Sequence, residues 1–335
     1  MKPRRRKGLK IAGIIAGSLV AVVLLATAIL LYRLSRVTLP SDPRPAATYE
    51  EAVGRVAELK ARDGGDIIRP SIFLDQGSRV ETAVVLFHGF TNNPEQFERI
   101  GRDYYAAGYN VLIPRLPEHG QRDLMTRDLS KITSARLADA MNEAVDIAAG
   151  LGDNVEVVGL SGGGTLAALA ARDREEVSKA VIISPLFGVD FLPSSVVRLA
   201  VAWSHMLRDV YMWWDPGLKE KHLPPDGYPR YSLRSVGAFF EVAFDIAHGN
   251  PKQRSKLDRV VLITNAADRT IDEAQASSAV SFALKPLAAN YEAFEFPRSA
   301  GYTHDLIDPS GLNAENIDAI YATVYPYLGL APREN

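Results

Sequence analysis

A short glycine-rich motif constrains the fold of this chain more than any other feature. The run Gly159-Leu160-Ser161-Gly162-Gly163 lies between an apolar, strand-like stretch and an alanine-rich, helical stretch. A serine at a tight strand-to-helix turn takes up a strained backbone conformation, so the residues two before and two after it must be small. Gly159 and Gly163 meet that requirement. The motif predicts a strand that ends abruptly, with Ser161 exposed above the sheet and the Gly162 N–H directed at the same space.

Apolar runs of strand length recur along the chain and alternate with helical segments. Such alternation is typical of an α/β protein with a mostly parallel central sheet and helices on both faces. Ligands of open parallel sheets bind beyond the carboxyl ends of the strands, so residues that follow the strands are candidates for a functional site. We expect strands at 67–74, 83–87, 109–114, 155–159, 180–184, 259–264 and 291–296, and a long helix at 135–151.

Two residues with suitable chemistry follow the last two predicted strands. Asp268 comes soon after the sixth strand, and His304 comes soon after the seventh. A serine hydroxyl is a poor nucleophile at neutral pH and needs a base within hydrogen-bond reach and a third group that orients the base. Ser161, His304 and Asp268 suit these three roles. The chain order Ser, Asp, His is that of one of the three serine-triad folds.

These motifs together resemble those of the α/β-hydrolase superfamily, over most of the chain beyond about residue 80. The resemblance is closest to the carboxylesterase and monoacylglycerol-lipase-like branch. The run His88-Gly89-Phe90-Thr91, after the second predicted strand, resembles the oxyanion loop of that branch. The resemblance implies that the Phe90 N–H joins the Gly162 N–H in binding an oxyanion. It also implies that His88 and Gly89 order this loop and that His88 takes no part in catalysis.

The loop that carries the acid departs from the family pattern. Relatives often have a glycine just before the acid, whereas Ala267 precedes Asp268 here, so Asp272 remains an alternative acid. The run 117–120 (Pro-Glu-His-Gly) resembles the turn found after the fourth strand in that branch. We therefore expect His119 to be a loop residue near the site.

We expect neither a metal nor an organic cofactor. The chain has no cysteine, and its six histidines form no close pair of zinc-ligand spacing with another histidine or a glutamate. His205, His222 and His248 lie between the fifth and sixth predicted strands and are expected to be surface or packing residues.

An insertion at about 186–256 is expected to form a helical cap. It holds all three tryptophans, with helical spacing of apolar residues at 196–203 and 239–244 and an aromatic turn at 211–216. These aromatic residues have two interpretations. They pack the cap onto the catalytic body, or they form a lid that lines an acyl pocket, since small-molecule pockets are largely apolar and aromatic.

The first part of the chain predicts a membrane anchor. The segment 11–32 is apolar and uncharged, and about 20 such residues cross a bilayer core. Residues 1–10 form a basic flank, which places the N-terminus in the cytoplasm and the catalytic domain outside, on a bacterial periplasmic or extracellular face. A cleaved signal peptide is the alternative. Residues 33–64 are expected to be a linker with a short helix, and residues 65–330 the catalytic domain.

Charge separates the two parts of the chain. The first 40 residues carry eight basic and no acidic side chains, which leaves 30 basic and 40 acidic residues in the remainder. Phosphate binding needs clustered lysine and arginine, so an acidic body argues against a nucleic-acid partner. The expected partners are the membrane and a small-molecule ester, for which lipid-derived esters are one option. The sequence does not predict an oligomeric state.

The sequence as a whole predicts a membrane-anchored serine hydrolase that cleaves carboxylic esters through an acyl-enzyme intermediate, a carboxylesterase or a lipase-like or lysophospholipase-like enzyme. Two alternatives stay open. The same triad could serve an acyltransferase or a peptidase, or the fold could be a catalytically silent binding module, because fold alone does not establish function.

Overall fold

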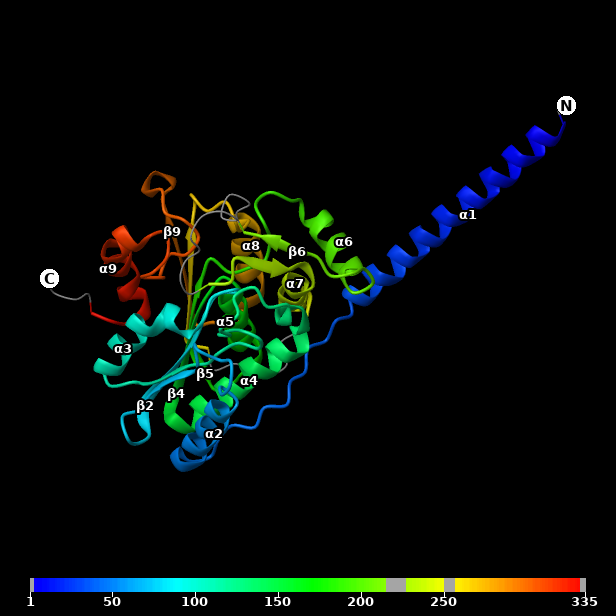
Figure 1. The fold of residues 1–335 in the computed structure, drawn as a ribbon. Helices are drawn as coiled ribbons and strands as arrows, with labels where there is room; N and C mark the ends of the chain where they lie inside the picture. Colours follow the sequence, from blue (N-terminus) through cyan, green and yellow to red (C-terminus); the bar gives the residue numbers. More distant parts are fainter. Residues whose placement is uncertain (1–2, 215–226, 250–256, 332–335) are drawn as a thin grey trace.

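The expected strands assemble into a seven-stranded sheet in the computed structural model (Figure 1), which describes residues 3–214, 227–249 and 257–331, with side chains from residue 13 onward. The spatial order is β1-β3-β2-β4-β5-β8-β9, and all neighbours are parallel except β1 and β3. The predicted mostly parallel sheet is confirmed. Its strands are β1 (Ile72–Leu74), β2 (Val80–Phe87), β3 (Asn110–Ile113), β4 (Gly152–Leu160), β5 (Val177–Ile183), β8 (Arg259–Asn265) and β9 (Asn290–Phe296).

The strand register brings the carboxyl ends of the central strands to one edge of the sheet. Phe87 at the end of β2 lies opposite Gly159 of β4, and Asn265 at the end of β8 lies opposite Phe296 of β9. Parallel strands that end together release their following loops into the same space. The loops that carry the predicted site residues therefore start from one edge.

The first expected strand is much shorter than predicted. It was expected at 67–74, but β1 covers only Ile72–Leu74. Pro70 has no N–H to give to a strand ladder. The N–H groups of Ile68 and Arg69 instead both donate to Gly120 O, at 2.9 and 3.1 Å. The segment before Pro70 is thus held by the loop after β3, and only the residues beyond the proline pair with β3.

Helices cover both faces of the sheet, as the α/β pattern predicts. Side chains alternate between the faces along each strand. Val85 and Phe87 of β2 join a cluster with α4, α5 and α8, whereas Leu86 joins a second cluster with α3 and α9. These helices are α3 (Glu98–Ala106), α4 (Ser134–Leu151), α5 (Gly162–Asp173), α8 (Glu273–Leu284) and α9 (Ile317–Leu328).

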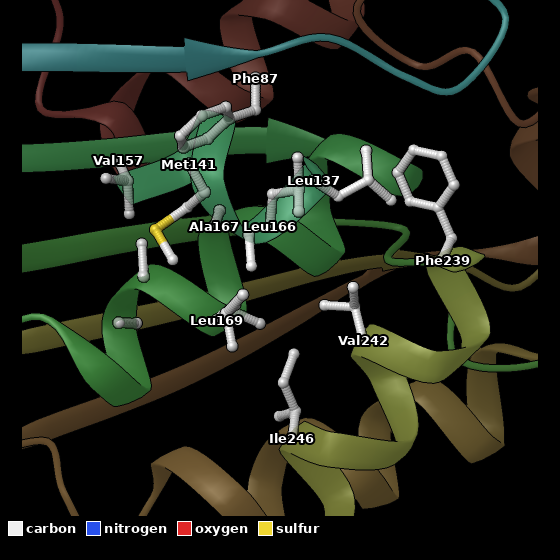
Figure 2. Close-up of a cluster of buried hydrophobic side chains, with 14 of the residues drawn as sticks. Phe87, Leu137, Met141, Val157, Leu166, Ala167, Leu169, Phe239, Val242 and Ile246 are labelled. Carbon is white, nitrogen blue, oxygen red and sulfur yellow. The ribbon is translucent and has the colours of Figure 1, made fainter. Parts of the chain in front are cut away.

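The first cluster connects the sheet with the cap (Figure 2). Phe87 and Val157 point from the sheet toward α4 and α5, where Leu166 lies at the centre of the view. Phe239 and Ile246 approach the same cluster from α7 (Leu233–His248), a helix of the insertion. The insertion is therefore part of the main core.

The cap contains the two expected helices and one unexpected feature. α6 (Ser194–Ser204) and α7 cover the two segments with helical spacing. The predicted aromatic turn is wrong for Tyr211–Trp213, which forms strand β6 antiparallel to β7 (Arg230–Ser232). Aromatic side chains favour a pleated, half-buried surface, and β7 supplies the pairing partner from beyond residue 226. Residues 215–216 of the predicted turn lie outside the described residues.

The N-terminal helix α1 (Pro3–Leu34) extends far from the folded body (Figure 1). Its stretch Gly13–Leu34 is long and apolar enough to cross a membrane. The helix is longer than the predicted 11–32 because the basic flank is helical as well. A second helix, α2 (Tyr49–Ala61), begins after Thr48, whose side chain accepts a hydrogen bond from the Glu51 N–H at 3.2 Å.

Candidate active site

Ser161 lies in a strained turn between β4 and α5. Its backbone angles are φ 57° and ψ −120°, a conformation that costs a non-glycine residue about 1–3 kcal/mol and persists only where surrounding contacts impose it. The Ser161 N–H donates to Ile183 O at 2.9 Å, and Ser161 O accepts from the Leu186 N–H at 3.1 Å. The neighbouring strand β5 and the loop after it therefore hold the turn that the sequence predicts.

The glycines around Ser161 permit a close approach of the turn between β4 and α5 to β2. A Cβ on Gly163 would overlap with the carbonyl oxygens of Phe87 and His88, and a Cβ on Gly159 would overlap with Gly163 O. These neighbours are backbone atoms, so no side chain can move aside. The sequence requirement for small residues thus has a direct steric cause.

Gly163→Ala is therefore expected to destabilise the fold by about 3 kcal/mol or more, at the upper end of overpacking costs. Gly54→Ala is the matched control, because a Cβ there meets nothing within 4 Å. That change, in the middle of helix α2, should raise stability by about 0.5–1 kcal/mol. Thermal unfolding of both full-length variants measures the difference. Equal midpoints for Gly163→Ala and the wild type would contradict the steric account.

The loop after β2 lies directly beside the serine turn. A Cβ on Gly89 would be 3.7 Å from Ser161 Cβ, and a Cβ on Gly162 would be 3.1 Å from Phe90 Cβ. The Gly89 N–H donates to Gln96 Oε1 at 2.7 Å, which fixes the start of the loop. Among the described residues, the N–H groups of Phe90 and Gly162 have no hydrogen-bond partner. Both donors are thus available to a ligand.

His88 and His119 hold this loop as neutral imidazoles. His88 Nε2 accepts from the Leu116 N–H at 3.1 Å, so its Nδ1–H donates to Gly89 O at 2.9 Å. His119 Nε2 accepts from the Thr91 N–H at 3.1 Å. Burial lowers the pKa of His88 well below its ordinary value and the pKa of His119 to about 4. Each ring has both nitrogens engaged with backbone groups, an arrangement that suits ordering of the loop and leaves no free base.

His304 pairs with Asp268. His304 Nδ1 lies 2.6 Å from Asp268 Oδ2, and Asp268 Oδ1 accepts from the N–H groups of Thr270 and Ile271 at 2.7 and 3.2 Å. Burial alone would raise the pKa of Asp268, but the His304 hydrogen bond and charge and the two N–H donors lower it overall. Burial alone would lower the pKa of His304, but the hydrogen bond and charge of Asp268 raise it overall. Asp268 therefore stays ionised and orients the imidazole.

Asp272, the alternative acid, has a different role in the structure. It is the N-cap of α8, and its Oδ1 accepts from the Gln275 N–H at 2.9 Å. An aspartate that caps a helix satisfies one of the free N–H groups of the first turn. The geometry thus pairs His304 with Asp268 and leaves Asp272 to the helix.

Ser161 and His304 are not joined by a hydrogen bond among the described residues. The hydrogen bonds of the described residues do not include one from Ser161 Oγ to His304 Nε2. Such bonds are often long in sites without substrate and tighten when substrate binds. The structure therefore forms the Asp268–His304 pair and places it at the same sheet edge as Ser161.

Three polar residues that the sequence did not single out support the loop that leads from β9 to His304, called the histidine loop below. Asn265 Nδ2 donates to Tyr302 O at 2.9 Å, and Asn313 Nδ2 donates to Thr303 O at 3.1 Å. Glu273 Oε1 accepts from the Asn265 N–H at 3.1 Å. It also accepts from the hydroxyl of Ser184, which follows β5, at 2.7 Å. An Asp or Glu in the first turn of a helix is ordinary, so no sequence signal distinguished Glu273.

Glu273 brings a buried carboxyl close to the Asp268–His304 pair. Its Oε2 is buried and has no hydrogen-bond partner among the described residues. Burial, together with the charge of Asp268, raises the pKa of Glu273 to about 7. The charge of Glu273 in turn contributes to the raised pKa of His304.

Glu273→Gln is expected to move the acid limb of the kcat/KM profile to lower pH. His304 must be neutral to accept a proton, so the rate rises as the imidazolium deprotonates. Above pH 7 Glu273 is ionised and stabilises the imidazolium; glutamine removes that charge and keeps an acceptor oxygen. Profiles of the wild type, Glu273→Gln and the exposed control Glu58→Gln test this. An acid limb that does not move in Glu273→Gln would show that the two groups are uncoupled.

Two further described histidines have partners within the cap. His205 is half-exposed on the cap, where its Nε2 lies 2.6 Å from Glu241 Oε1, and His248 Nδ1 lies 3.0 Å from Phe244 O. Both have the surface or packing contacts that were expected, whereas His222 lies outside the described residues. In the described part of the chain, no group of three or more His, Asp or Glu side chains is arranged to hold a metal ion.

This fold is of the α/β-hydrolase type. It combines the strand order of the sheet, the strained turn at Ser161 and the Asp268–His304 pair. A family model described as the alpha/beta hydrolase family matches residues 84–307. The chain belongs to this family. A thermostable monoacylglycerol lipase from Bacillus sp. (strain H-257) is 31% identical over 101 residues, which cover 30% of this chain and 39% of that lipase.

Solved structures show the same fold at low sequence identity. The monoacylglycerol lipase of Paleococcus ferrophilus superposes with a TM-score of 0.55 and 20% identity, over 77% of this chain and 97% of that one. A soluble variant of monoglyceride lipase from Saccharomyces cerevisiae, in complex with a substrate analog, has a TM-score of 0.55 and 14% identity, over 77% and 89% of the two chains.

Proposed function

We propose that this protein is a membrane-anchored serine hydrolase that cleaves carboxylic esters, with lipid-derived esters such as monoacylglycerols as its substrates. The observation that carries the proposal is the common sheet edge, where a serine in a strained turn, two free N–H groups and an Asp–His pair meet. The family membership and the names of the similar lipases support the ester class.

The residues present account for a complete acyl transfer. His304 Nε2 takes the proton of Ser161 Oγ as the oxygen attacks the ester carbonyl, and the N–H groups of Phe90 and Gly162 donate to the resulting oxyanion. Each such donor lowers the barrier by about 3 kcal/mol. His304 then gives the proton to the leaving alcohol, and the acyl group remains on Ser161. Water, deprotonated by His304, cleaves this acyl-enzyme, releases the acid and restores the serine.

The cap supports an apolar acyl group over the oxyanion loop. Phe239 of α7 would touch a Cβ on Gly162, and its ring lies 5.1 Å from that of Phe90. Just after β6, the Trp214 ring lies 4.2 Å from the ring of Tyr231 in β7 and 6.2 Å from the ring of Phe90. Aromatic rings beside the oxyanion loop suit a hydrocarbon chain better than a polar acyl group. Phe239 packs the cap onto the main core, and we propose that Phe239, Trp214 and Tyr231 also form a lid beside the acyl group.

The anchor supports a substrate that is present in membranes. The apolar part of α1 has the length of a bilayer core, and the basic flank favours a cytoplasmic N-terminus with the catalytic domain on the outer face. An enzyme fixed at a bilayer surface meets lipid esters at high local concentration.

Product analysis with the full-length protein tests the proposal. p-Nitrophenyl esters of increasing chain length and a monoacylglycerol are supplied, with water alone or with added alcohol or amine acceptors. We expect free fatty acid as the product, and a preference for medium or long acyl chains. Transfer to the added alcohol or amine would favour an acyltransferase, and cleavage of amides in preference to esters would favour a peptidase. A folded protein with no turnover would favour the binding module.

A further inference from the structure

The last two turns of α1 pack on the cap. Ala26, Leu30 and Leu31 are half-buried and Leu34 is buried, whereas the side chains of residues 13–25 are exposed. This spacing is one stripe of a helix. Leu30 and Leu31 pack against the main core cluster, and this end of α1 contacts α6 (Figure 1).

This contact determines where the cap lies along the axis of helix α1. The apolar stretch 11–32 is about 33 Å long at 1.5 Å per residue, close to the roughly 30 Å of a bilayer core. Ala26 and Leu34 are separated by about 12 Å on the same scale. α6 therefore lies beside the outer end of the apolar stretch. If α1 spans the membrane as proposed, α6 sits at the surface of the outer leaflet.

The side of α6 that faces away from the core carries exposed apolar side chains beside Ser194 and Ser195. Val197, Val201 and Ala202 are buried against the core, while Leu199, on the outer side, is 42% exposed. In the rest of the catalytic body that the structure describes, exposed large apolar residues are scattered singly, as Phe282 is on α8. By contrast, eight of them fall within the 22 residues of 191–212, and such a concentration of exposed apolar side chains marks an interaction site. We define the cap face as the exposed apolar residues Phe191, Leu192, Val196, Leu199, Met206, Leu207, Val210 and Met212.

The charges near the cap face suit a lipid surface. Although the chain beyond residue 40 is acidic overall, the segment 191–214 has a single acidic residue, Asp209. Asp209 is paired, since it accepts from the Ser232 hydroxyl at 2.7 Å and from the Arg234 N–H at 3.2 Å. Arg208 in the same segment is exposed, as is Arg36 just beyond α1. Exposed arginines beside an apolar face favour anionic lipid headgroups.

The cap face continues to the candidate active site. Trp214 follows directly after β6 and is partly exposed, yet its Nε1–H donates to Thr91 Oγ1 at 2.8 Å. Thr91 is the neighbour of Phe90 in the oxyanion loop. One side chain thus connects the outer surface of the cap with the loop that would bind the oxyanion.

We propose that the cap face docks on the outer leaflet of the bilayer that α1 spans, and that an ester lipid enters the site beside Trp214 without passing through water. This inference rests on the membrane anchoring in the proposed function. Its occupant is a phospholipid bilayer surface. A second copy of the chain on the same face is the rival outcome of the test.

The absence of cysteine allows a clean labelling experiment. Leu199→Cys, Leu24→Cys and Phe282→Cys, each in the full-length chain, carry one environment-sensitive fluorophore in vesicles of phosphatidylcholine and phosphatidylglycerol. Lipids with nitroxide groups at defined depths quench the fluorophore. We expect the Leu199 label to be quenched most by a shallow nitroxide and the Leu24 label by a deep one. The Phe282 label, on a side chain that is 75% exposed on α8, should stay in water.

The three labels distinguish the two possible failures. In the first, the Leu24 label is quenched but the Leu199 label stays in water like the Phe282 label. That result would overturn docking and leave the anchor intact. No quenching at Leu24 would overturn the anchor, and docking with it. A Leu199 signal that depends on protein concentration in detergent, and not on lipid, would assign the face to a second copy and overturn docking.

A kinetic measurement adds an independent readout. The double variant Val196→Asp/Leu199→Asp should hydrolyse vesicle-embedded monoacylglycerol at least about tenfold more slowly, because two apolar side chains no longer bury in lipid. Its rate on the water-soluble p-nitrophenyl acetate should match the wild type. Equal slowing on both esters would contradict docking. Absence of activity on both esters in the wild type would count against the proposed function, while the labelling experiment would still decide docking.

Discussion

Ser161→Ala is expected to lower ester turnover by a factor on the order of 10⁵ without unfolding the protein. The alanine cannot attack a carbonyl, and the residual rate comes only from binding and from the Phe90 and Gly162 donors. Steady-state kinetics with p-nitrophenyl butyrate measures the loss, and the thermal midpoint checks the fold. Ser78→Ala, at an exposed serine before β2, is the matched control and should retain full activity.

Two results would count against Ser161 as the nucleophile. The first is a Ser161→Ala variant with the wild-type thermal midpoint and more than about one hundredth of the wild-type rate, since loss of a true nucleophile costs far more. The second is an acylated residue other than Ser161 in a rapidly quenched wild-type reaction.

Asp268→Asn is expected to lower turnover by about 10⁴-fold. Asparagine keeps the size of the side chain, but its amide cannot stabilise the imidazolium, and it can stabilise the wrong tautomer of His304. Asp272→Asn provides the matched control in the same loop. Asparagine is as good an N-cap as aspartate, so α8 should keep its cap and activity should change little.

The pair of variants compares the two acids directly. Loss of turnover in Asp272→Asn, with normal turnover in Asp268→Asn, would overturn the assignment. Loss in both would indicate that the loop between β8 and α8 has rearranged, which circular dichroism and the thermal midpoints would detect.

The sheet and the order of the site residues could be predicted because they depend on local pattern. Buried parallel strands are near-continuous apolar runs, and the glycines beside Ser161 report a close approach that no larger residue permits. Where the prediction from the sequence was wrong, pairing with a residue far away in the chain determined the local structure. Tyr211–Trp213 forms a strand only because β7 pairs with it, and Ile68 and Arg69 are held by Gly120.

The supporting residues of the site could not have been found from the sequence. Asn265, Glu273 and Asn313 are ordinary strand-end, helix-start and loop residues, and their roles arise only when the fold brings them to the histidine loop. The contact between α1 and α6 could not be predicted either. The two helices are far apart in the chain, and their apolar residues do not indicate that they pack together. Tertiary contacts of single side chains leave no periodic pattern.

The most direct test of the central claim is covalent labelling of the full-length protein with a fluorophosphonate, followed by peptide mass spectrometry. An activated serine reacts with such a probe, whereas an ordinary surface serine does not. The account predicts a single adduct, on Ser161, that is lost in Ser161→Ala and strongly reduced in Asp268→Asn. A folded protein that carries no adduct, or an adduct at another residue, would contradict it.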